Sequence, residues 1–223
     1  MNQNIIITIG RQFGSGGREV AKTIAEKLNI DFFDKELIAL AAKESGLSES
    51  LFDGIDEKPT NSLLYSLVMG IQSGRGTYYR YGDVLNSDGL FRIQSQTIRN
   101  LAEKTPCVIV GRCADYVLRD QPKLVKVFVH ADMESRIKRV MEVYEVNEKD
   151  AKNMITKTDK RRSSFYNFYT NNEWGAVDNY NLAVDTTKIG IDAAATLVAD
   201  YVKLAFNEEW FITYKCNIKM LDK

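Results

Sequence analysis

The sequence has little of the chemistry that disulfide-bonded proteins and metal sites use, since its 223 residues include three cysteines and one histidine. Cys107, Cys113 and Cys216 are an odd number without close paired spacing, which disfavours a disulfide framework and a zinc site. No apolar run approaches the roughly 20 residues that cross a bilayer, and the N-terminus MNQNIIITIG lacks the basic segment and cleavage signal of a secretory leader. We therefore expect no resident metal, no membrane partner and a cytoplasmic location, where thiols stay reduced.

The chain also lacks an excess of charge of either sign, because Lys and Arg together number 30 and Asp and Glu together number 30. A net charge of zero argues against a general nucleic-acid or membrane-surface binder, although it is compatible with a local basic site. The composition is that of an ordinary globular protein, with 44% hydrophobic and 27% charged residues. With neither an internal repeat nor a low-complexity linker, residues 1–223 are predicted to form a single domain.

Short apolar runs alternate with segments of helical periodicity along most of the chain. The predicted strands are residues 4–9, 30–34, 107–111, 124–129 and 180–185, and the predicted helices include residues 17–28, 90–104, 133–145 and 189–206. Within residues 17–28, the apolar positions follow the spacing of one helical face. Strands that alternate with helices predict an α/β fold with a parallel sheet covered on both faces.

The stretch IIITIGRQFGSGGREV, residues 5–20, runs from the first predicted strand through a glycine loop into the first predicted helix. Such a loop turns its amides inward, and the helix N-terminus adds about half a positive charge, so the arrangement favours a phosphate. The usual phosphate-loop pattern is G-x-x-x-x-G-K-[ST]. When its final glycine is placed on Gly16, Arg11 falls on the first glycine, Gly17 on the lysine and Arg18 on the Ser/Thr, so the pattern is not met.

The residues of this loop meet the physical requirements of an anion site although they do not match the phosphate-loop pattern. Three glycines let a phosphate approach the backbone, and two arginines bring cations to the loop. These residues are Gly14, Gly16, Gly17, Arg11 and Arg18. The missing hydroxyl normally binds Mg²⁺, and Ser15 is the candidate to replace it. The loop is thus predicted to bind phosphate, with a plain turn that binds no ligand as the alternative.

Five segments, in order along the chain, resemble one known family. They are GRQFGSGGREVAKTIAEKLNIDFFDKELI, CVIVGRCADYVL, SRIKRV, TDKRRSSFYNFYT and NYNLAVDTTKIGIDAA, and they extend over most of the chain from Ile5 to Tyr201. Together they are similar to the cytidylate-kinase-like family, relatives of bacterial cytidylate kinase within the P-loop nucleoside monophosphate kinases. A loop without the lysine, reading GSGGRE, is typical of that family.

The resemblance implies a P-loop NTPase-type three-layer fold that binds ATP on its core and phosphorylates a small phosphorylated acceptor, such as the nucleoside monophosphate CMP. It implies a helical acceptor-side insert at about residues 35–90 and an arginine-bearing lid at about residues 155–178. Mg²⁺ would be held largely by ATP oxygens and water. One departure argues against CMP itself, because Asp34 is followed by KELIAL where relatives that phosphorylate CMP continue with a T-G-x-x-Y-R type sequence.

Two residues are candidates for the acceptor side of the implied site. Asp34 ends the second predicted strand, where the resemblance gives it the task of orienting the acceptor or a magnesium-bound water, and it also suits a helix N-cap. Arg112 matches the Gly-Arg dipeptide that reaches the acceptor site in cytidylate kinases, and a surface salt bridge is the alternative. Cys113 replaces the aspartate that those kinases carry next.

Further cations lie in two predicted helical segments and are candidates to stabilise the transferred charge. Arg136 and Arg139 are three residues apart, hence on one helical face. Asp159 and Arg162 reproduce the D-x-x-R spacing of the kinase lid, and Arg161 adds a cation; an ordinary basic helix end is the alternative. Residues 147–170 are predicted to begin as a helix and to lead into an aromatic, basic segment. The candidate catalytic set is therefore Arg18, Arg112, Arg136, Arg139, Asp159, Arg161 and Arg162.

Aromatic residues follow these cations closely. These aromatic residues would stack on a base, cover the closed site, or pack the lid against the core; they are Phe165, Tyr166, Phe168, Tyr169 and Trp174. A contact with a second subunit of a homo-oligomer is a further alternative.

Three functions are compatible with these residues. The first is ATP-dependent phosphoryl transfer to a small phosphorylated acceptor, with a nucleoside monophosphate as the expected class. The second is a nucleotide-binding regulatory protein without kinase turnover, which the absent lysine, hydroxyl and acceptor signature favour. The third is a small-molecule kinase with a non-nucleotide acceptor, because function belongs to the site and not to the fold.

Overall fold

The computed structural model describes residues 4–34 and 87–206. The strands are β1 (Ile6–Arg11), β2 (Asp31–Phe33), β3 (Cys107–Val110), β4 (Leu124–His130) and β5 (Leu182–Asp185). The helices are α1 (Gly17–Leu28), α5 (Ser87–Lys104), α6 (Ala114–Val117), α7 (Met133–Tyr144), α8 (Glu148–Thr170) and α9 (Thr186–Phe206), with a 3₁₀ turn, η2 (Val177–Asn179), before β5.

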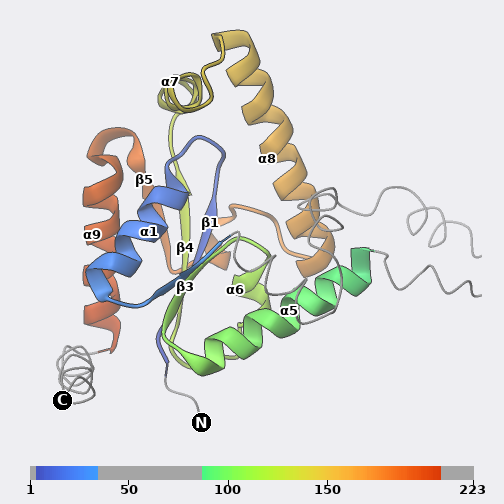
Figure 1. The fold of residues 1–223 in the computed structure, drawn as a ribbon, viewed down its shortest axis with the longest axis vertical. Coiled ribbons are helices and arrows are strands. Elements are labelled where there is room, and N and C mark those ends of the chain that lie inside the picture. The colour runs from blue at the N-terminus through green and yellow to red at the C-terminus, as the bar shows by residue number, and fades with distance from the viewer. Residues whose placement is uncertain (1–3, 35–86, 207–223) are drawn as a thin grey trace, which may run out of the picture.

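The described strands form one sheet in the order β2-β3-β1-β4-β5, and every pair is parallel, which confirms the predicted parallel sheet (Figure 1). β1 lies at the centre, where Ile9 is opposite Val110 of β3 and Val127 of β4. Because all the strands run in one direction, their carboxyl ends meet at the same edge of the sheet, where open α/β sheets bind ligands. The segments that follow β1, β2 and β3 therefore gather at that edge.

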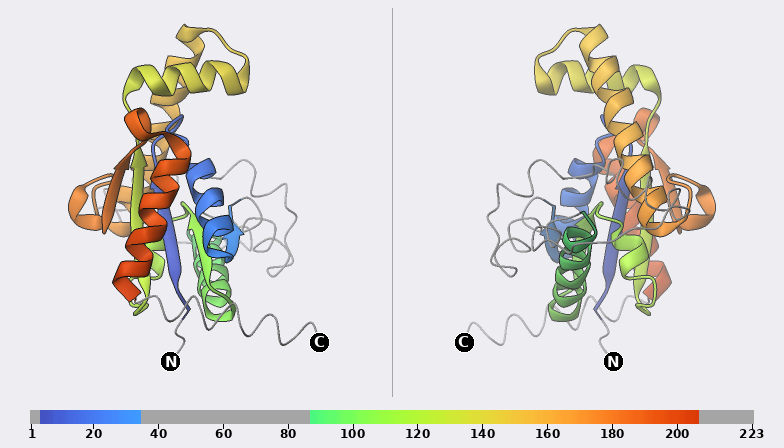
Figure 2. Two further views of the ribbon diagram at one scale, coloured as in Figure 1. Left: turned by 90° about the vertical axis from the view of Figure 1, so that its left-hand side faces the viewer. Right: turned by 90° about the vertical axis from the view of Figure 1, so that its right-hand side faces the viewer.

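Helices cover both faces of the sheet, α1 and α9 on one side and α5 and α6 on the other (Figure 1, Figure 2). The alternation of side chains along β1 explains the two layers. Ile5, Ile7 and Ile9 belong to the apolar cluster under α1 and α9, and Ile6 belongs to the cluster under α5 and α6. Each of these isoleucines is at most 1% exposed. Their burial stabilises the sheet by about 1.5–3 kcal/mol per side chain.

The predicted boundaries of the first helix and the first strand can be compared with those in the structure. The predicted helix 17–28 is α1 as the structure has it. The first strand, predicted over residues 4–9, instead begins at Ile6 and ends at Arg11. Asn4 lies outside the strand, and its side-chain amide donates to two carbonyls at the end of α5, both at 3.2 Å. Gly10 and Arg11 join the strand because β4 continues far enough to pair with them.

α7 and α8 form a helical hairpin that projects above the carboxyl edge of the sheet (Figure 1, Figure 2). The Asn147 side chain caps α8 by accepting a hydrogen bond from the Asp150 amide at 2.9 Å. The aromatic, basic segment after residue 155 is helical as far as Thr170, so the predicted lid region 155–178 is the second half of α8 plus the turn to η2. The predicted insert at about 35–90 lies outside the described residues except for the first turn of α5. No described helix combines the length and apolarity that crossing a membrane requires.

Candidate functional site

The loop between β1 and α1 turns tightly around glycines. Gly14 and Gly16 both have φ of 78°, a left-handed conformation that glycine adopts without strain. A β-carbon on Gly14 would lie 2.9 Å from both the Arg136 carbonyl oxygen and Val140 Cγ2, so only glycine fits against α7 there. Gly16 is the N-cap of α1 and offers no side-chain cap to the first amides of the helix.

The amides of this loop are arranged for an anion. Among residues 4–34 and 87–206, no hydrogen-bond acceptor is recorded for the amides of Gly14, Gly16 and Gly17. The positive end of the α1 dipole lies at the same place, because Gly17 is its first residue. A phosphate oxygen supplies what such amides need, so the loop has the local features of a phosphate site although the lysine is absent.

A cavity of about 440 Å³ opens over this loop. Arginine side chains from five different segments line it, and two carboxylates accompany them. The arginines are Arg11, Arg18, Arg112, Arg139, Arg161 and Arg162, and the carboxylates are Glu19 and Asp34. The excess of guanidinium groups gives the cavity a positive field, which favours a ligand with several negative charges.

Arg18 and Asp34 form an ion pair at the rim of the cavity. Arg18 Nε donates to Asp34 Oδ2 at 2.7 Å, and the two side chains are 50% and 11% exposed. The pair links the first turn of α1 to the end of β2. Asp34 thus lies in the cavity, as its predicted role toward the acceptor requires; the helix that it was predicted to cap begins outside the described residues.

Arg112 lies deeper, with only 7% of its surface exposed, so it is not a surface salt-bridge residue. The pKa of Arg112 is lowered to about 10, mainly by burial and in addition by the nearby charges of Arg11 and Arg162, while the charge of Asp34 opposes this shift. The guanidinium remains charged at neutral pH. Three like charges held this close repel one another, and an anion bound between them would remove that cost.

The backbone that carries Arg112 is unusual. Gly111, Arg112 and Cys113 have φ of 75°, 59° and 54°, three successive left-handed residues between β3 and α6. For a residue with a β-carbon this conformation costs of the order of 1–2 kcal/mol. Such strain concentrates at functional sites, where it fixes the direction of a side chain. Here it directs Arg112 into the cavity.

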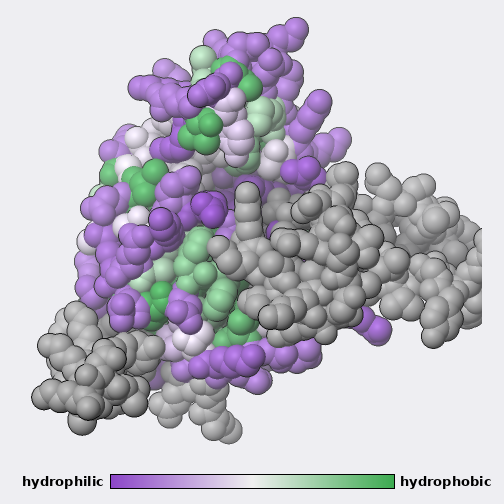
Figure 3. Space-filling view, viewed as in Figure 1, coloured by the Kyte–Doolittle hydropathy of each residue, from purple (hydrophilic) through white to green (hydrophobic). Residues whose placement is uncertain are grey.

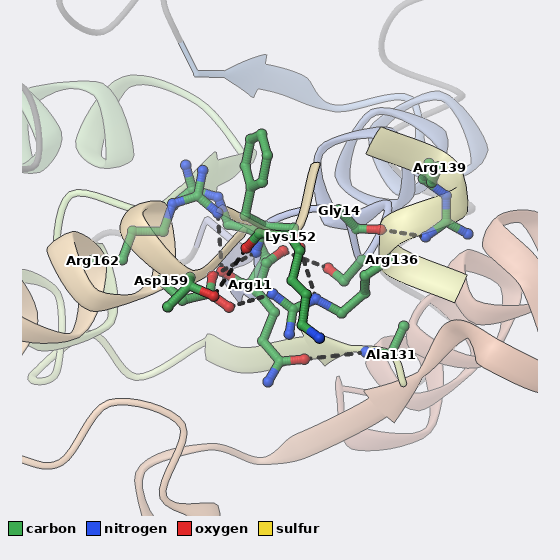
Figure 4. A network of polar contacts seen from close by, with 12 residues as sticks. Arg11, Gly14, Ala131, Arg136, Arg139, Lys152, Asp159 and Arg162 are labelled. Carbon is green, nitrogen blue, oxygen red and sulfur yellow. Dashed lines mark hydrogen bonds and ion pairs between the residues drawn. The ribbon is translucent and has the colours of Figure 1, made fainter. Parts of the chain in front are cut away.

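Two predicted catalytic residues do not line the cavity. Arg136 and Asp159 form an ion pair between α7 and α8, and their side chains are 5% and 19% exposed (Figure 4). Arg136 Nε donates to the Phe13 carbonyl at 2.8 Å, and Asp159 Oδ1 accepts from the Phe13 amide at 2.8 Å. Both side chains therefore contact the loop backbone behind the cavity surface.

Ser15 is also turned away from the cavity. The residue is fully buried, and its hydroxyl donates to the Gln12 carbonyl at 2.9 Å. The buried hydroxyl of Thr186 donates to the Ser15 carbonyl at 2.7 Å, which ties the loop to the start of α9. In this arrangement Ser15 stabilises the turn and presents no oxygen to a metal bound over the loop.

Sequence patterns missed an apolar wall on the α7–α8 side of the cavity. It includes Phe13, Val140, Val143, Tyr144 and Met154. Val143 and Tyr144 are 62% and 49% exposed, and apolar surface is visible where α7 meets α8 at the top of Figure 3. The signal in the sequence was weak because three of these residues lie in the charged helix 133–145 and the other two, Phe13 and Met154, lie in separate segments. Glu19 was missed because it reads as an ordinary first-turn acid of α1.

A second polar group lies beneath Arg112, around Asp115. The Tyr166 hydroxyl donates to Asp115 Oδ2 at 2.7 Å. Burial raises the pKa of the Asp115 carboxyl, and burial beside Asp115 raises the pKa of the Tyr166 and Tyr180 phenols. A cleft of about 30 Å³ separates these groups from Arg11, Arg112 and Arg162. That is room for about two water molecules, so the group supports the floor of the site.

The aromatic residues of α8 pack against the core, which is one of the alternatives that the sequence left open. Phe165 and Tyr166 are buried with Cys113 in one cluster, which Phe91, Tyr116, Tyr169 and Trp174 extend. Phe91 and Tyr169 stack with centroids 4.0 Å apart. Phe168 is 50% exposed and contacts Tyr169 edge-on. This cluster fastens the second half of α8 to α5 and α6.

The carboxylates that line the cavity suit a magnesium ion held mainly by a ligand. Within the described part of the chain no group of three or more His, Cys, Asp or Glu side chains is close enough to bind a metal alone. Asp34 and Glu19 both face the cavity. Mg²⁺ is commonly held by one or two carboxylates together with phosphate oxygens and water, and this donor set fits that pattern.

Comparisons with known proteins give one family match and several structures of similar fold. The profile of the cytidylate kinase-like family matches residues 6–188. A search of the curated proteins finds no match. Among solved structures, an uncharacterized protein from Eubacterium ventriosum is 33% identical with a TM-score of 0.67, over 90% of this chain and 99% of that chain.

Two shikimate kinases share the fold at lower identity. The protein from Bacteroides thetaiotaomicron is 13% identical with a TM-score of 0.52, over 89% of this chain and 98% of that chain. The protein from Acinetobacter baumannii, solved in complex with shikimate, is 10% identical with a TM-score of 0.50, over 93% of this chain and 97% of that chain. At these identities the likeness concerns the arrangement of the elements alone.

Proposed function

The chain belongs to the cytidylate kinase-like family, and on that premise we propose that it transfers the γ-phosphoryl group of ATP to a small phosphorylated acceptor. The acceptor class that we propose is a nucleoside monophosphate, and CMP is one member of it. The observation that carries the proposal is the meeting of the loop amides and six guanidinium groups around one cavity of about 440 Å³. Phosphoryl transfer needs this combination, because its transition state spreads negative charge over several oxygens that must be held in line.

The donor side of the proposed site is the loop together with the start of α1. The amides of Gly14, Gly16 and Gly17 would bind phosphate oxygens. Arg139 Nη1 already donates to the Gly14 carbonyl at 2.6 Å, so a guanidinium lies over the loop and would supply the charge of the absent lysine. Arg18 adds a second cation from the first turn of α1. Mg²⁺ would offset the remaining charge, held by phosphate oxygens and water with Asp34 or Glu19 nearby.

The acceptor side of the proposed site is the floor formed by Arg112 and Asp34. Arg112 is buried and held by its backbone in one direction, which suits it to bind a phosphate of the acceptor. Asp34 lies beside it, accepts from Arg18 and is available to orient the acceptor. Arg11 and Arg162, whose charges lower the pKa of Arg112, would lie on either side of the transferred group.

The proposal keeps the expected organisation of the chain as one kinase-like domain over residues 1–223. The insert at about 35–90 would bind the acceptor. The region 155–178 would cover the site, with Arg161 and Arg162 turned toward the cavity. Closing such a cover excludes water and so prevents ATP hydrolysis without transfer.

A second candidate function is a nucleotide-responsive regulatory protein without turnover. The specific observation in its favour is the loop itself, which has no lysine and whose Ser15 hydroxyl is buried against the Gln12 carbonyl. Such a loop would bind a nucleotide through its amides and arginines and would still lack a direct protein ligand for the metal.

One assay panel separates these functions. The protein is incubated with ATP and Mg²⁺ and with each nucleoside monophosphate in turn, and ADP formation is followed. Turnover that depends on one monophosphate supports the proposed kinase. ATP binding in calorimetry without ADP formation for any of them supports the regulatory protein. A parallel set of non-nucleotide alcohols and phosphate esters tests the remaining possibility, a kinase with a non-nucleotide acceptor.

A further inference from the structure

Side chains of the α7–α8 hairpin form hydrogen bonds with the backbone of residues 11–14 in the phosphate loop (Figure 4). Arg136 Nε donates to the Phe13 carbonyl at 2.8 Å, and the Phe13 amide donates to Asp159 Oδ1 at 2.8 Å. Arg139 Nη1 donates to the Gly14 carbonyl at 2.6 Å, and Arg162 Nη1 donates to the Arg11 carbonyl at 3.2 Å. The carbonyl groups of Arg11, Phe13 and Gly14 are thereby directed toward the hairpin.

Arg136 and Asp159 differ from the other two side chains in this set. They are paired with each other, and neither lines the cavity that Arg139 and Arg162 face. Together they bind both polar backbone groups of Phe13. An ion pair that is closed in this way has little charge left for a substrate, and its main effect falls on the peptide groups that it holds.

The direction of the carbonyls decides whether the loop can bind an anion. A carbonyl oxygen that pointed into the cavity would repel a phosphate. When the carbonyl oxygens instead accept hydrogen bonds from the hairpin, the N–H groups of the loop face the cavity. Within the described residues the amides of Gly14, Gly16 and Gly17 have no recorded acceptor, as this arrangement requires. The glycines allow many conformations, so the loop needs external contacts to remain in this one.

We propose that Arg136 and Asp159 are positioning residues for the phosphate loop, which act through the Phe13 backbone and contact neither donor nor acceptor. The inference rests on the proposed function only in naming ATP as the ligand. It departs from the catalytic role that the D-x-x-R spacing of the kinase lid gave Asp159 in the sequence.

Two kinds of measurement test the inference, with Asp159→Ala, Asp159→Asn and the control Glu142→Ala. Glu142 is an exposed carboxylate on α7 outside the cavity lining. Calorimetry with ATP–Mg²⁺ in the absence of acceptor should show at least a tenfold loss of affinity for Asp159→Ala and no change for Glu142→Ala. Asp159→Asn keeps an oxygen for the Phe13 amide but loses the ion pair, so its affinity should fall by a smaller factor, about three- to fivefold.

Amide hydrogen exchange of the free protein gives the second measurement, which needs no nucleotide. Asp159→Ala should speed exchange in the peptide covering residues 11–17 and leave the β3 and β4 peptides unchanged. With an acceptor from the assay panel, the KM for ATP should rise while the KM for the acceptor stays within twofold. A rise in the acceptor KM alone, or unchanged loop exchange, would overturn the inference.

The two proposals fail separately. If the wild-type protein binds no ATP, the proposed function is wrong, and loop exchange in the variants still decides the inference. If Asp159→Ala does not fold, Asp159→Asn decides it, because unchanged ATP affinity and unchanged loop exchange in that variant would both contradict a positioning role.

Discussion

The side chain of Arg11 fills the space that a β-carbon on Gly111 would need. Gly111 has φ of 75°, and a β-carbon built on it would overlap Arg11 Nη1 and lie 3.1 Å from Arg11 Cζ. On its other side, Cβ of Arg11 lies 2.5 Å from the place of a β-carbon on Gly17. Arg11 therefore passes between two glycines, one at the start of α1 and one after β3. Because neither glycine has a side chain, the Arg11 side chain has room to pass between them and place its guanidinium at the cavity.

Replacement of Gly111 by alanine should therefore damage both stability and binding. The left-handed backbone costs alanine about 1–2 kcal/mol, which corresponds to a fall in Tm of about 2–8 °C for a chain of this size. The displaced Arg11 should also reduce ATP affinity more than tenfold. Gly175→Ala is the matched control, because Gly175 has φ of 81° but lies against Phe128 outside the cavity lining. Equal ATP affinities for the two variants would remove Arg11 from the proposed site.

Arg18→Ala should weaken ATP binding or turnover more than tenfold while changing the Tm of the free protein little. The ion pair with Asp34 contributes little to stability, because the Arg18 side chain is 50% exposed and surface pairs are worth about 0–1 kcal/mol. Its contribution appears only when a phosphate lies in the cavity. Calorimetry and steady-state kinetics measure the effect, with Lys22→Ala, one turn further along α1 and 65% exposed, as control. Unchanged kinetics would exclude Arg18 from the site.

Arg139→Ala tests whether an arginine from α7 supplies the charge of the missing loop lysine. A hydrogen bond to a charged group contributes about 1.5–3 kcal/mol, so ATP affinity should fall by about ten- to hundredfold. The neighbouring Lys138 is exposed and outside the cavity lining, and Lys138→Ala should bind ATP as the wild type does. Arg139→Lys should recover part of the lost affinity. If both alanine variants behave alike, the charge over the loop comes from another residue.

The sequence was sufficient to predict the parts of the molecule that depend on local periodicity. α1 was predicted to the residue, because its apolar positions and its flanking glycines and asparagine are local signals. The parallel sheet followed from the alternation of strands and helices. All six arginines around the cavity were also named from the sequence. Three of them, Arg11, Arg18 and Arg112, directly follow strands or the glycine loop, and these segments must meet at one edge of the sheet.

What the sequence could not predict depends on which groups meet in space. Arg136 and Arg139 are one helical turn apart and look equivalent, yet Arg136 turns to Phe13 and Asp159 while Arg139 faces the cavity. The choice depends on how α7 packs against α8. Ser15 was named as the candidate to replace the missing magnesium-binding hydroxyl because it lies in the glycine loop, and the three-dimensional turn instead directs its hydroxyl to Gln12. The positions of these residues in the sequence reveal neither the direction of the two arginine side chains nor the partner of the Ser15 hydroxyl.

Asp115 was another residue whose surroundings only the structure reveals, and it leads to a prediction about pH. Burial raises the pKa of its carboxyl above the usual 3.8, so the folded state holds the proton more tightly than the unfolded state does. As pH rises above 3.8, the unfolded state loses its proton first, and the free energy of unfolding falls. The substitution Asp115→Asn removes this fall in the free energy of unfolding. The asparagine oxygen can still accept the hydrogen bond that the Tyr166 hydroxyl donates to Asp115 Oδ2 at 2.7 Å in the wild type.

Asp115→Asn should therefore have a higher Tm than the wild type at pH 7, and the difference should shrink as the pH is lowered toward 4. Thermal unfolding at half-unit steps between pH 4 and pH 8 measures it. Asp120→Asn is the control, because that carboxylate is 89% exposed and its replacement should give no pH-dependent difference. A constant difference across the range, or a wild type that is the more stable at pH 7, would show that the Asp115 carboxyl is ionised in the fold without cost. The hydrogen bonds that this carboxylate accepts and the charge of Lys126 would then outweigh its burial.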